Sequence, residues 1–280
     1  MSPSSEGMRD RAPEEFIVDF RTSKGEFSVV FTRDWASHGV DRVFNLVRNG
    51  FFDKGGGYER GARFYRVLKN WVCQFGVSPD PEISAVYDYR NDVDGAILPD
   101  DAVVASNERG TVSFSAAYSE KEMAVNRTTE LYINYLNNSR LDAHGFAPVG
   151  RVASGLEVVD AFYDLYGEMV DACSLHPEKN NTCHGVNETL LYSQGEAYLE
   201  REFPRLDFIL SASIRGEEGY GDNVGWALAS IPFLACALAV CACASFVAYR
   251  KKRHRDRPQV QMVKYENVGD EEDEDNQLFH

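Results

Sequence analysis

The sequence predicts a mainly β protein, a closed antiparallel barrel with two helices, followed by a single membrane-spanning helix. Two observations predict the barrel. Short apolar runs recur between turn-rich connections, and only two stretches carry apolar residues at helical spacing. Many short strands with few helices are typical of barrels, because closing a sheet removes its edges. The membrane helix is predicted by one long apolar stretch near the C-terminus.

A polar N-terminal segment covers residues 1–13, and a hairpin and a helix are predicted after it. Residues 1–13 are expected to be disordered. Residues 14–34 contain EEFIVDF and EFSVVF, which alternate apolar and polar side chains around the turn sequence of residues 22–25. Residues 40–47 then carry apolar side chains at helical spacing, and Gly50 follows as a stop signal.

The rest of the domain, which we expect to extend over residues 14–214, contains five more strand candidates and a second helix. The helix is predicted over 155–167, while 78–108 is rich in Asp and Pro and predicts a loop. A polar insertion occupies about 168–195, and 196–214 regains apolar residues that would dock on the barrel. The strand candidates are RFYRVLK (63–69), WVCQFGV (71–77), TVSFSA (111–116), ELYINY (130–135) and GFAPVGRV (145–152).

The membrane helix is predicted over residues 224–249, after a linker at 215–223. The stretch has no charged residue, and at about 1.5 Å per residue it is long enough to cross a hydrocarbon core of about 30 Å. Basic residues crowd 250–257, directly after it, which by the positive-inside rule places the C-terminus in the cytosol. We therefore expect a luminal or extracellular domain and a disordered cytosolic tail, 250–280.

Glycosylation and cysteine patterns agree with that topology. Cys173 and Cys183 flank a polar loop and would form a disulfide in an oxidising compartment, the alternative being two unrelated thiols. No apolar signal-peptide region is visible at the N-terminus, so a tail-anchored protein with a cytosolic domain is the alternative topology. Four acceptor patterns for N-glycosylation lie on the predicted outer side, at Asn126, Asn137, Asn180 and Asn187.

Composition and motifs exclude several functions. The net charge of −15 and the pI of about 4.9 argue against nucleic acid as a partner, because phosphate binding needs a basic face. The sequence shows no zinc pattern, phosphate-binding loop or nucleophile elbow. We therefore expect no metal and no cofactor.

Four stretches together resemble the cyclophilin family of peptidyl-prolyl cis-trans isomerases in order, content and spacing. They are RFYRVLKNWVCQFG (63–76), GTVSFSAA (110–117), NRTTELYINYLNNSRLD (126–142) and GFAPVGRV (145–152). The resemblance covers roughly residues 14–167. It implies a closed eight-stranded antiparallel barrel capped by two helices, and an enzyme that binds proline-containing segments of client proteins.

The resemblance also implies a site. Rotation about the bond before proline has a barrier of about 18–20 kcal/mol, which falls when a donor meets the prolyl nitrogen and an apolar pocket holds the ring. Arg66 takes the place of the family's catalytic arginine, and Gln74 that of the glutamine that bonds substrate backbone. Ser115 and Ala116 would meet the peptide through backbone groups. The residues that would line the proline pocket are Trp71, Val72, Tyr132 and Leu141.

Two departures from the family pattern leave two functions open. Glu130, among the substrate-binding positions, is expected to pair with Arg66 and divert it from substrate. Tyr132 brings a hydroxyl to the floor of an apolar pocket, where an unpaired hydroxyl costs about 1–3 kcal/mol. The favoured function is a prolyl isomerase that assists folding of luminal or extracellular proteins. The alternative is a catalytically weak or inactive cyclophilin-like module that binds proline-containing segments at a membrane.

Overall fold

The computed structural model describes residues 2–54, 57–175 and 183–217. The chain divides into two units, Met1–Tyr220 and Gly221–His280, and the second lies outside the described residues. The predicted membrane helix, 224–249, and tail, 250–280, therefore also lie outside them, as does the predicted linker beyond residue 217. Within the described ranges, no helix has the length and apolar character needed to cross a bilayer.

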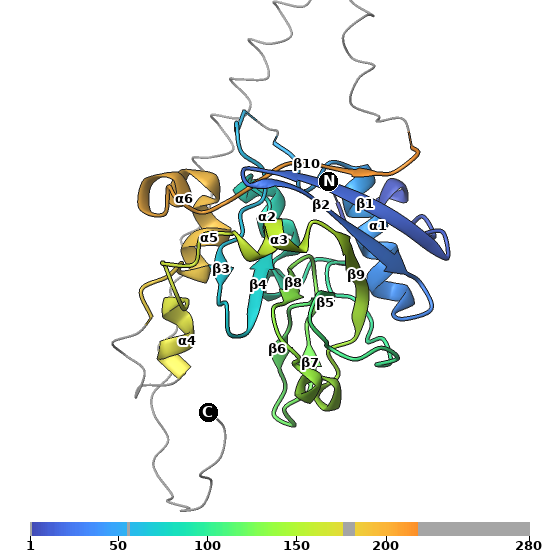
Figure 1. Ribbon diagram of the computed structural model, residues 1–280. Coiled ribbons are helices and arrows are strands. Elements are labelled where there is room, and N and C mark those ends of the chain that lie inside the picture. The colour runs from blue at the N-terminus through green and yellow to red at the C-terminus, as the bar shows by residue number, and fades with distance from the viewer. Residues whose placement is uncertain (1, 55–56, 176–182, 218–280) are drawn as a thin grey trace, which may run out of the picture. The chain divides into compact units, whose positions relative to one another are not determined.

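The first unit is built on an eight-stranded antiparallel sheet, with the order β10-β1-β2-β9-β5-β8-β4-β3 (Figure 1). The mainly β prediction and its eight strands are confirmed. A separate pair, β6 (Ala117–Tyr118) and β7 (Ala124–Val125), forms a small second sheet. The strands of the main sheet are β1 (Glu15–Thr22), β2 (Gly25–Thr32), β3 (Arg66–Val67), β4 (Val72–Phe75), β5 (Thr111–Phe114), β8 (Leu131–Asn134), β9 (Pro148–Ser154) and β10 (Ile209–Ile214).

The sheet curls into a half-barrel, and its edge strands β3 and β10 do not pair directly. The chain just before β3 approaches β10 instead. Gly61 N donates to Ile209 O at 3.0 Å, and Ile209 N donates to Ala62 O at 2.9 Å. Phe64 N donates to Asp207 O at 2.9 Å. The closed barrel expected from the sequence is therefore only partly correct. The two edge strands are not paired with each other, and backbone hydrogen bonds from the chain before β3 to the β10 side connect the edges instead.

The helices differ more from the prediction than the strands do. The first predicted helix is confirmed as α1, but the second ends early as α3, because Phe162 turns into the core and Tyr163 N donates to Asp207 Oδ2. α2 occupies part of the expected loop 78–108, where Asp80 caps its N-terminus. The helices are α1 (Ser37–Arg48), α2 (Pro81–Tyr87), α3 (Leu156–Asp160), α4 (Val170–Leu175), α5 (Glu188–Gln194) and α6 (Glu196–Glu202), with 3-10 helices η1 (Glu6–Met8), η2 (Tyr89–Asn91) and η3 (Ser139–His144).

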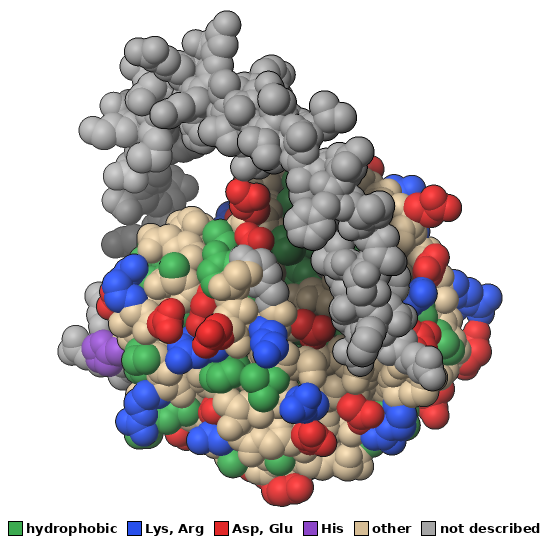
Figure 2. Space-filling model, turned by 90° about the horizontal axis from the view of Figure 1, so that it is seen from above, with side chains coloured by type: hydrophobic (Ala, Val, Ile, Leu, Met, Phe, Trp, Pro, Cys, Tyr) green, Lys and Arg blue, Asp and Glu red, His purple; other side chains and the backbone are tan. Residues whose placement is uncertain are grey.

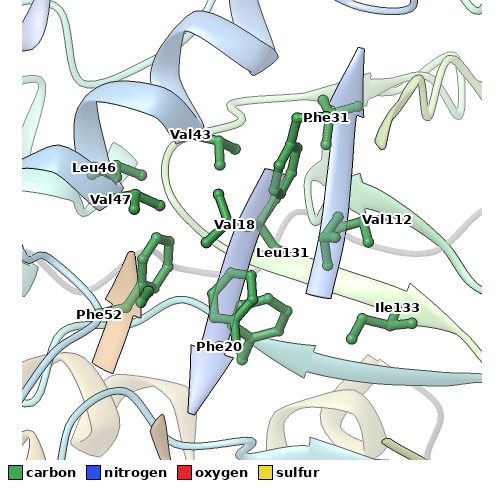
Figure 3. Close-up of a cluster of buried hydrophobic side chains, with 14 of the residues drawn as sticks. Val18, Phe20, Phe31, Val43, Leu46, Val47, Phe52, Val112, Leu131 and Ile133 are labelled. Atoms are coloured by element: carbon green, nitrogen blue, oxygen red, sulfur yellow. The ribbon is translucent and has the colours of Figure 1, made fainter. Parts of the chain in front are cut away.

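The main core lies between the curled sheet and α1 (Figure 3). Alternate residues of β1, Val18 and Phe20, point inward as the period of two requires. Val43 and Val47 of α1 cover them from the other side, four residues apart on one helix face. Each such side chain contributes roughly 1.5–3 kcal/mol when fully buried.

Residues 2–13, expected to be disordered, pack against this core. Met8 and Ala12 are buried, and Ala12 N donates to Asp41 Oδ1 of α1 at 2.9 Å. Asn49 Nδ2, just after α1, donates to Gly7 O at 2.9 Å. These two apolar side chains in a polar segment gave too weak a pattern for a sequence prediction.

A second apolar cluster joins the predicted insertion and the segment after it to the chain just before β3. α5 and α6 supply most of its side chains, and Figure 1 shows both helices beside β3. A buried ion pair between Arg63 and Glu196 of α6 anchors the same region. The cluster consists of Tyr65, Val77, Met169, Val186, Leu191, Tyr192, Tyr198, Leu199, Phe203 and Leu206. Docking of the 196–214 segment, through α6 and β10, is therefore observed.

Candidate active site

Three predicted site residues lie in one row across neighbouring strands. Arg66 of β3 is directly opposite Gln74 of β4, and Gln74 is opposite Tyr132 of β8. Side chains of directly opposed residues in an antiparallel pair lie on the same face, within about 5.5 Å at Cβ. The register of β3, β4 and β8 therefore places the guanidinium, the amide and the phenol side by side.

Gln74 is held by hydrogen bonds from both ends of its amide. Its Oε1 accepts from Arg66 Nη1 at 3.2 Å. Its Nε2 donates to Ser115 Oγ at 2.9 Å and to Glu130 Oε2 at 2.9 Å. Because the carboxylate of Glu130 only accepts, it fixes which end of the amide faces Arg66.

The partner of Arg66 is Glu168, a residue that the sequence analysis did not select. Nε donates to Glu168 Oε1 at 2.6 Å and Nη2 donates to Glu168 Oε2 at 2.7 Å, a bidentate pair. The guanidinium carbon also lies 4.6 Å from the centre of the Trp71 ring. Each terminal nitrogen keeps a second N–H, and these are the groups available to a substrate.

The expected pairing of Glu130 with Arg66 is wrong. Glu130 Oε1 accepts from the Tyr192 hydroxyl at 2.5 Å, and Oε2 accepts from the Tyr65 hydroxyl as well as from Gln74. Burial, together with the charge of Glu130, raises the pKa of both tyrosines, so both stay protonated and able to donate. Glu130 thus orients Gln74 and leaves Arg66 to Glu168.

Other acidic side chains surround Glu130 on the side of the insertion. Glu188 of α5 lies close enough that burial, and next the charge of Glu130, raise its pKa to about 7. Asp171 accepts from Glu188 N at 2.6 Å, and Asp88 binds Arg90. Although these acids gather, no group of three or more His, Cys, Asp or Glu among the described residues is arranged to hold a metal ion.

The predicted proline pocket forms a third apolar cluster, beside Arg66. Val72, Tyr132 and Leu141 are buried in it, with Trp71 and Ala116 packed against them. The sequence analysis missed two members, Ala124 of β7 and Phe146. Phe146 lies within the GFAPVGRV stretch, so its apolar position was visible although its contact was not. The structure thus brings all the predicted pocket residues together next to the guanidinium.

The Tyr132 hydroxyl is paired, contrary to expectation. It donates to Asn107 Oδ1 at 2.9 Å, and Asn107 is completely buried. The same oxygen accepts from Ser113 Oγ at 2.9 Å, while Asn107 Nδ2 donates to Phe146 O at 2.7 Å. Burial raises the pKa of Tyr132, so the hydroxyl is neutral. Asn107 lies in a turn-rich stretch, and no sequence signal linked it to the pocket floor.

The glycosylation predictions remain predictions. Asn137 is exposed, whereas Asn126 is half-buried with a φ of 60°. Asn187 caps α5, and its Nδ2 donates to Asp171 Oδ1 at 3.1 Å, so a glycan there would replace one N–H of that amide. Asn180 lies outside the described residues.

The predicted disulfide is only partly visible. Cys183 is buried and disulfide-bonded. The side chain of Cys173 lies outside the described residues, so its pairing with Cys183 stays a prediction. Cys73, in contrast, is a free buried thiol in β4 whose pKa burial raises to about 12.

Comparisons with known proteins agree with this geometry. The family model described as cyclophilin type peptidyl-prolyl cis-trans isomerase/CLD matches residues 17–181. The chain is similar to the peptidyl-prolyl cis-trans isomerase A of Dickeya dadantii (strain 3937), with 29% identity over 164 residues, 56% of this chain and 76% of that protein. It is also similar to a peptidyl-prolyl cis-trans isomerase of Acinetobacter baylyi, with 26% identity over 151 residues, 51% of this chain and 70% of that protein.

Solved structures show similarity at lower identity. A crystal structure of a Cryptosporidium parvum cyclophilin type peptidyl-prolyl cis-trans isomerase has 13% identity and a TM-score of 0.48, covering 73% of this chain and 99% of that one. A second crystal structure of that protein, in the presence of the dipeptide Ala-Pro, has a TM-score of 0.46 and 13% identity, covering 72% and 99%. The family model extends over more than half of the sequence, from β1 through the Arg66 row and the apolar pocket, and the chain therefore belongs to the cyclophilin-type peptidyl-prolyl cis-trans isomerases.

Proposed function

We propose that this chain isomerises the bonds before proline in segments of client proteins, with Arg66 as the catalytic donor. The observation that carries this is the position of the Arg66 guanidinium beside the third apolar cluster, in contact with Trp71. A proline ring seated on that cluster would bring its nitrogen toward the terminal N–H groups of Arg66. Apolar side chains with a few convergent polar groups beside them are the usual lining of a ligand site.

The reaction needs only positioning and one donor. Rotation about the peptide bond removes its double-bond character, and the prolyl nitrogen then regains a lone pair that accepts a hydrogen bond. Arg66 presents a planar fork of N–H donors and is held by Gln74 and Trp71, so its geometry is set before substrate binds. No covalent bond to the protein forms or breaks.

A catalytically weak binding module is the second candidate, because Glu168 occupies two of the donor groups of Arg66. If the chain is such a binding module, proline-containing segments would bind on the third apolar cluster without reaching the guanidinium of Arg66. Replacing Arg66 distinguishes the two candidate functions. It should greatly lower the isomerisation rate if the chain is an isomerase, and should leave peptide binding and the isomerisation rate nearly unchanged if the chain is a binding module.

Proline-limited refolding separates these candidates. Protein with native Arg66 should accelerate the slow refolding phase of a substrate protein, and Arg66→Ala should lower that acceleration about 10²-fold, as removal of one preorganised donor does elsewhere. Arg151→Ala, which removes an exposed arginine on β9, is the matched control and should keep the full effect. Equal acceleration by the native protein and Arg66→Ala would exclude Arg66 as the donor.

We further place this activity on a membrane, on its luminal or extracellular side, and the support is the sequence. The apolar stretch 224–249 with basic residues after it favours that topology, as do the acceptor asparagines. Expression in cells should give a protein whose mobility on a gel increases after glycosidase treatment, and Asn137→Gln should remove part of that shift. A chain that carries no glycan and is digested by protease added to the cytosolic side would contradict this topology.

A further inference from the structure

We propose that Glu168 determines substrate specificity: it holds Arg66 until a substrate takes its place, and then pairs with a basic side chain next to the substrate proline. The preferred substrate class is therefore a proline segment flanked by Lys or Arg. This inference rests on the proposed function, because it concerns the same donor.

The carboxylate of Glu168 lies against the guanidinium that the proposed function assigns to substrate, on the Nε and Nη2 side. Both of its oxygens accept from Arg66, on Nε and Nη2, and the two side chains are 14% and 22% exposed for Arg66 and Glu168. Both side chains are therefore partly exposed at the protein surface. A substrate that uses the Nη2 end of Arg66 competes directly with Glu168.

The backbone of Glu168 is fixed, so only its side chain can give way. Gly185 N donates to Glu168 O at 2.8 Å, and a Cβ on Gly185 would lie 2.6 Å from that oxygen. Met169, the next residue, is buried in the second apolar cluster. Glu168 Oε1 also accepts from Met169 N at 2.8 Å. A displaced carboxylate therefore stays at the edge of the site.

A displaced Glu168 would be an unpaired charge on a side that is already acidic. Asp171 of α4, three residues after Glu168 in the sequence, is a further carboxylate, and Arg90 is engaged by Asp88. Both oxygens of Glu130 already accept hydrogen bonds within the protein, from two tyrosine hydroxyls and Gln74. A carboxylate that loses its partner in a partly buried place is destabilised, and a cationic side chain of the substrate restores the pairing.

Figure 2 shows Lys or Arg and Asp or Glu side chains interspersed over the face seen from above, with no single sign dominating. Exposed charges of mixed sign are also screened within about 8–10 Å at physiological salt. Selection of a basic flank is assigned to one defined carboxylate, Glu168, through its pair with Arg66.

The test compares three peptides that differ only beside the proline, where they carry Lys, Ala or Glu. Cis/trans exchange is measured by NMR on the full-length protein, so no protease adds its own specificity. With the native protein, the exchange rate should be about fivefold higher for the Lys peptide than for the Ala peptide, and about fivefold higher for the Ala peptide than for the Glu peptide. This is the size expected of one partly exposed ion pair. Glu168→Gln should act about equally on all three and faster than the native protein on the Ala peptide.

The control is Glu15→Gln, which removes the same charge from an exposed position on β1 and should keep the native order of rates. In the native protein, raising NaCl from about 0.05 to 0.5 M should shrink the Lys preference, a readout independent of any variant. Equal native rates on the three peptides, or a Lys preference retained by Glu168→Gln, would overturn this inference and leave the isomerase intact. Absence of exchange on every peptide would instead overturn the proposed function.

Discussion

Replacing Glu196 by Ala should lower the free energy of unfolding by about 4 kcal/mol, because it leaves the Arg63 guanidinium buried and charged without its partner. Arg63 and Glu196 are only 2% and 4% exposed. Arg63 Nε donates to Glu196 Oε2 at 2.8 Å and Nη2 donates to Oε1 at 2.5 Å, while Nη1 donates to Leu206 O at 2.8 Å. The pair joins the chain before β3 to α6, so its loss weakens the support of the strand that carries Arg66.

Urea unfolding followed by tryptophan fluorescence measures this effect. With a slope near 2 kcal/mol per M, the midpoint should fall by about 2 M. Glu202→Ala on the same helix is the matched control, since its side chain is half exposed, and it should change the stability by less than about 0.5 kcal/mol. Arg63→Met combined with Glu196→Leu should recover most of the loss, because no buried charge remains. Equal midpoints for Glu196→Ala and Glu202→Ala would refute the reasoning.

Three further predictions concern the surroundings of the site. Because burial and the charge of Glu130 raise the pKa of Glu188 to about 7, the folded protein keeps a proton there that the unfolded chain releases above about pH 4.5. The free energy of unfolding should therefore fall by up to about 3 kcal/mol as the pH rises from about 4.5 to about 7. Melting curves of Glu188→Gln over this pH range should lack the fall. An unchanged pH dependence in that variant would assign the fall to another group. Tyr132→Phe should cost about 1 kcal/mol in urea unfolding, since Asn107 Oδ1 keeps other donors, and a loss above about 3 kcal/mol would contradict that. Gly76→Ala should cost more than about 1 kcal/mol, because Gly76 has a φ of +108° and a Cβ there would lie 2.4 Å from a backbone oxygen; a neutral effect in the same assay would show that the backbone adjusts.

The strands, and the grouping of the site candidates in one region, could be predicted because their signals are local. Alternation of apolar residues marks β1 and β2, whose inward side chains are buried as expected. Arg66, Gln74 and Tyr132 were found through stretches that resemble the family, and the register of β3, β4 and β8 then places them in one row.

The partners of these residues could not be predicted, because they depend on tertiary structure. Glu168 is 102 residues away from Arg66 in sequence and sits in a polar stretch with no periodicity. Glu130 is close to Arg66 in the sheet, but Tyr192, from a short helix of the insertion, takes one of its oxygens. The helices α5 and α6 are too short for a clear pattern of their own and are stabilised by the cluster they share with Tyr65.

The most direct test of the account is the rate of cis/trans exchange in a proline peptide, measured by NMR with catalytic amounts of native protein, Arg66→Ala and Arg66→Lys. We predict rapid exchange with the native protein and a rate at least about 10²-fold lower with Arg66→Ala. Arg66→Lys should be intermediate, because lysine keeps the charge without the fork. Native exchange rates in a folded Arg66→Ala protein, with an unchanged circular dichroism spectrum, would contradict the central claim that Arg66 is the catalytic donor.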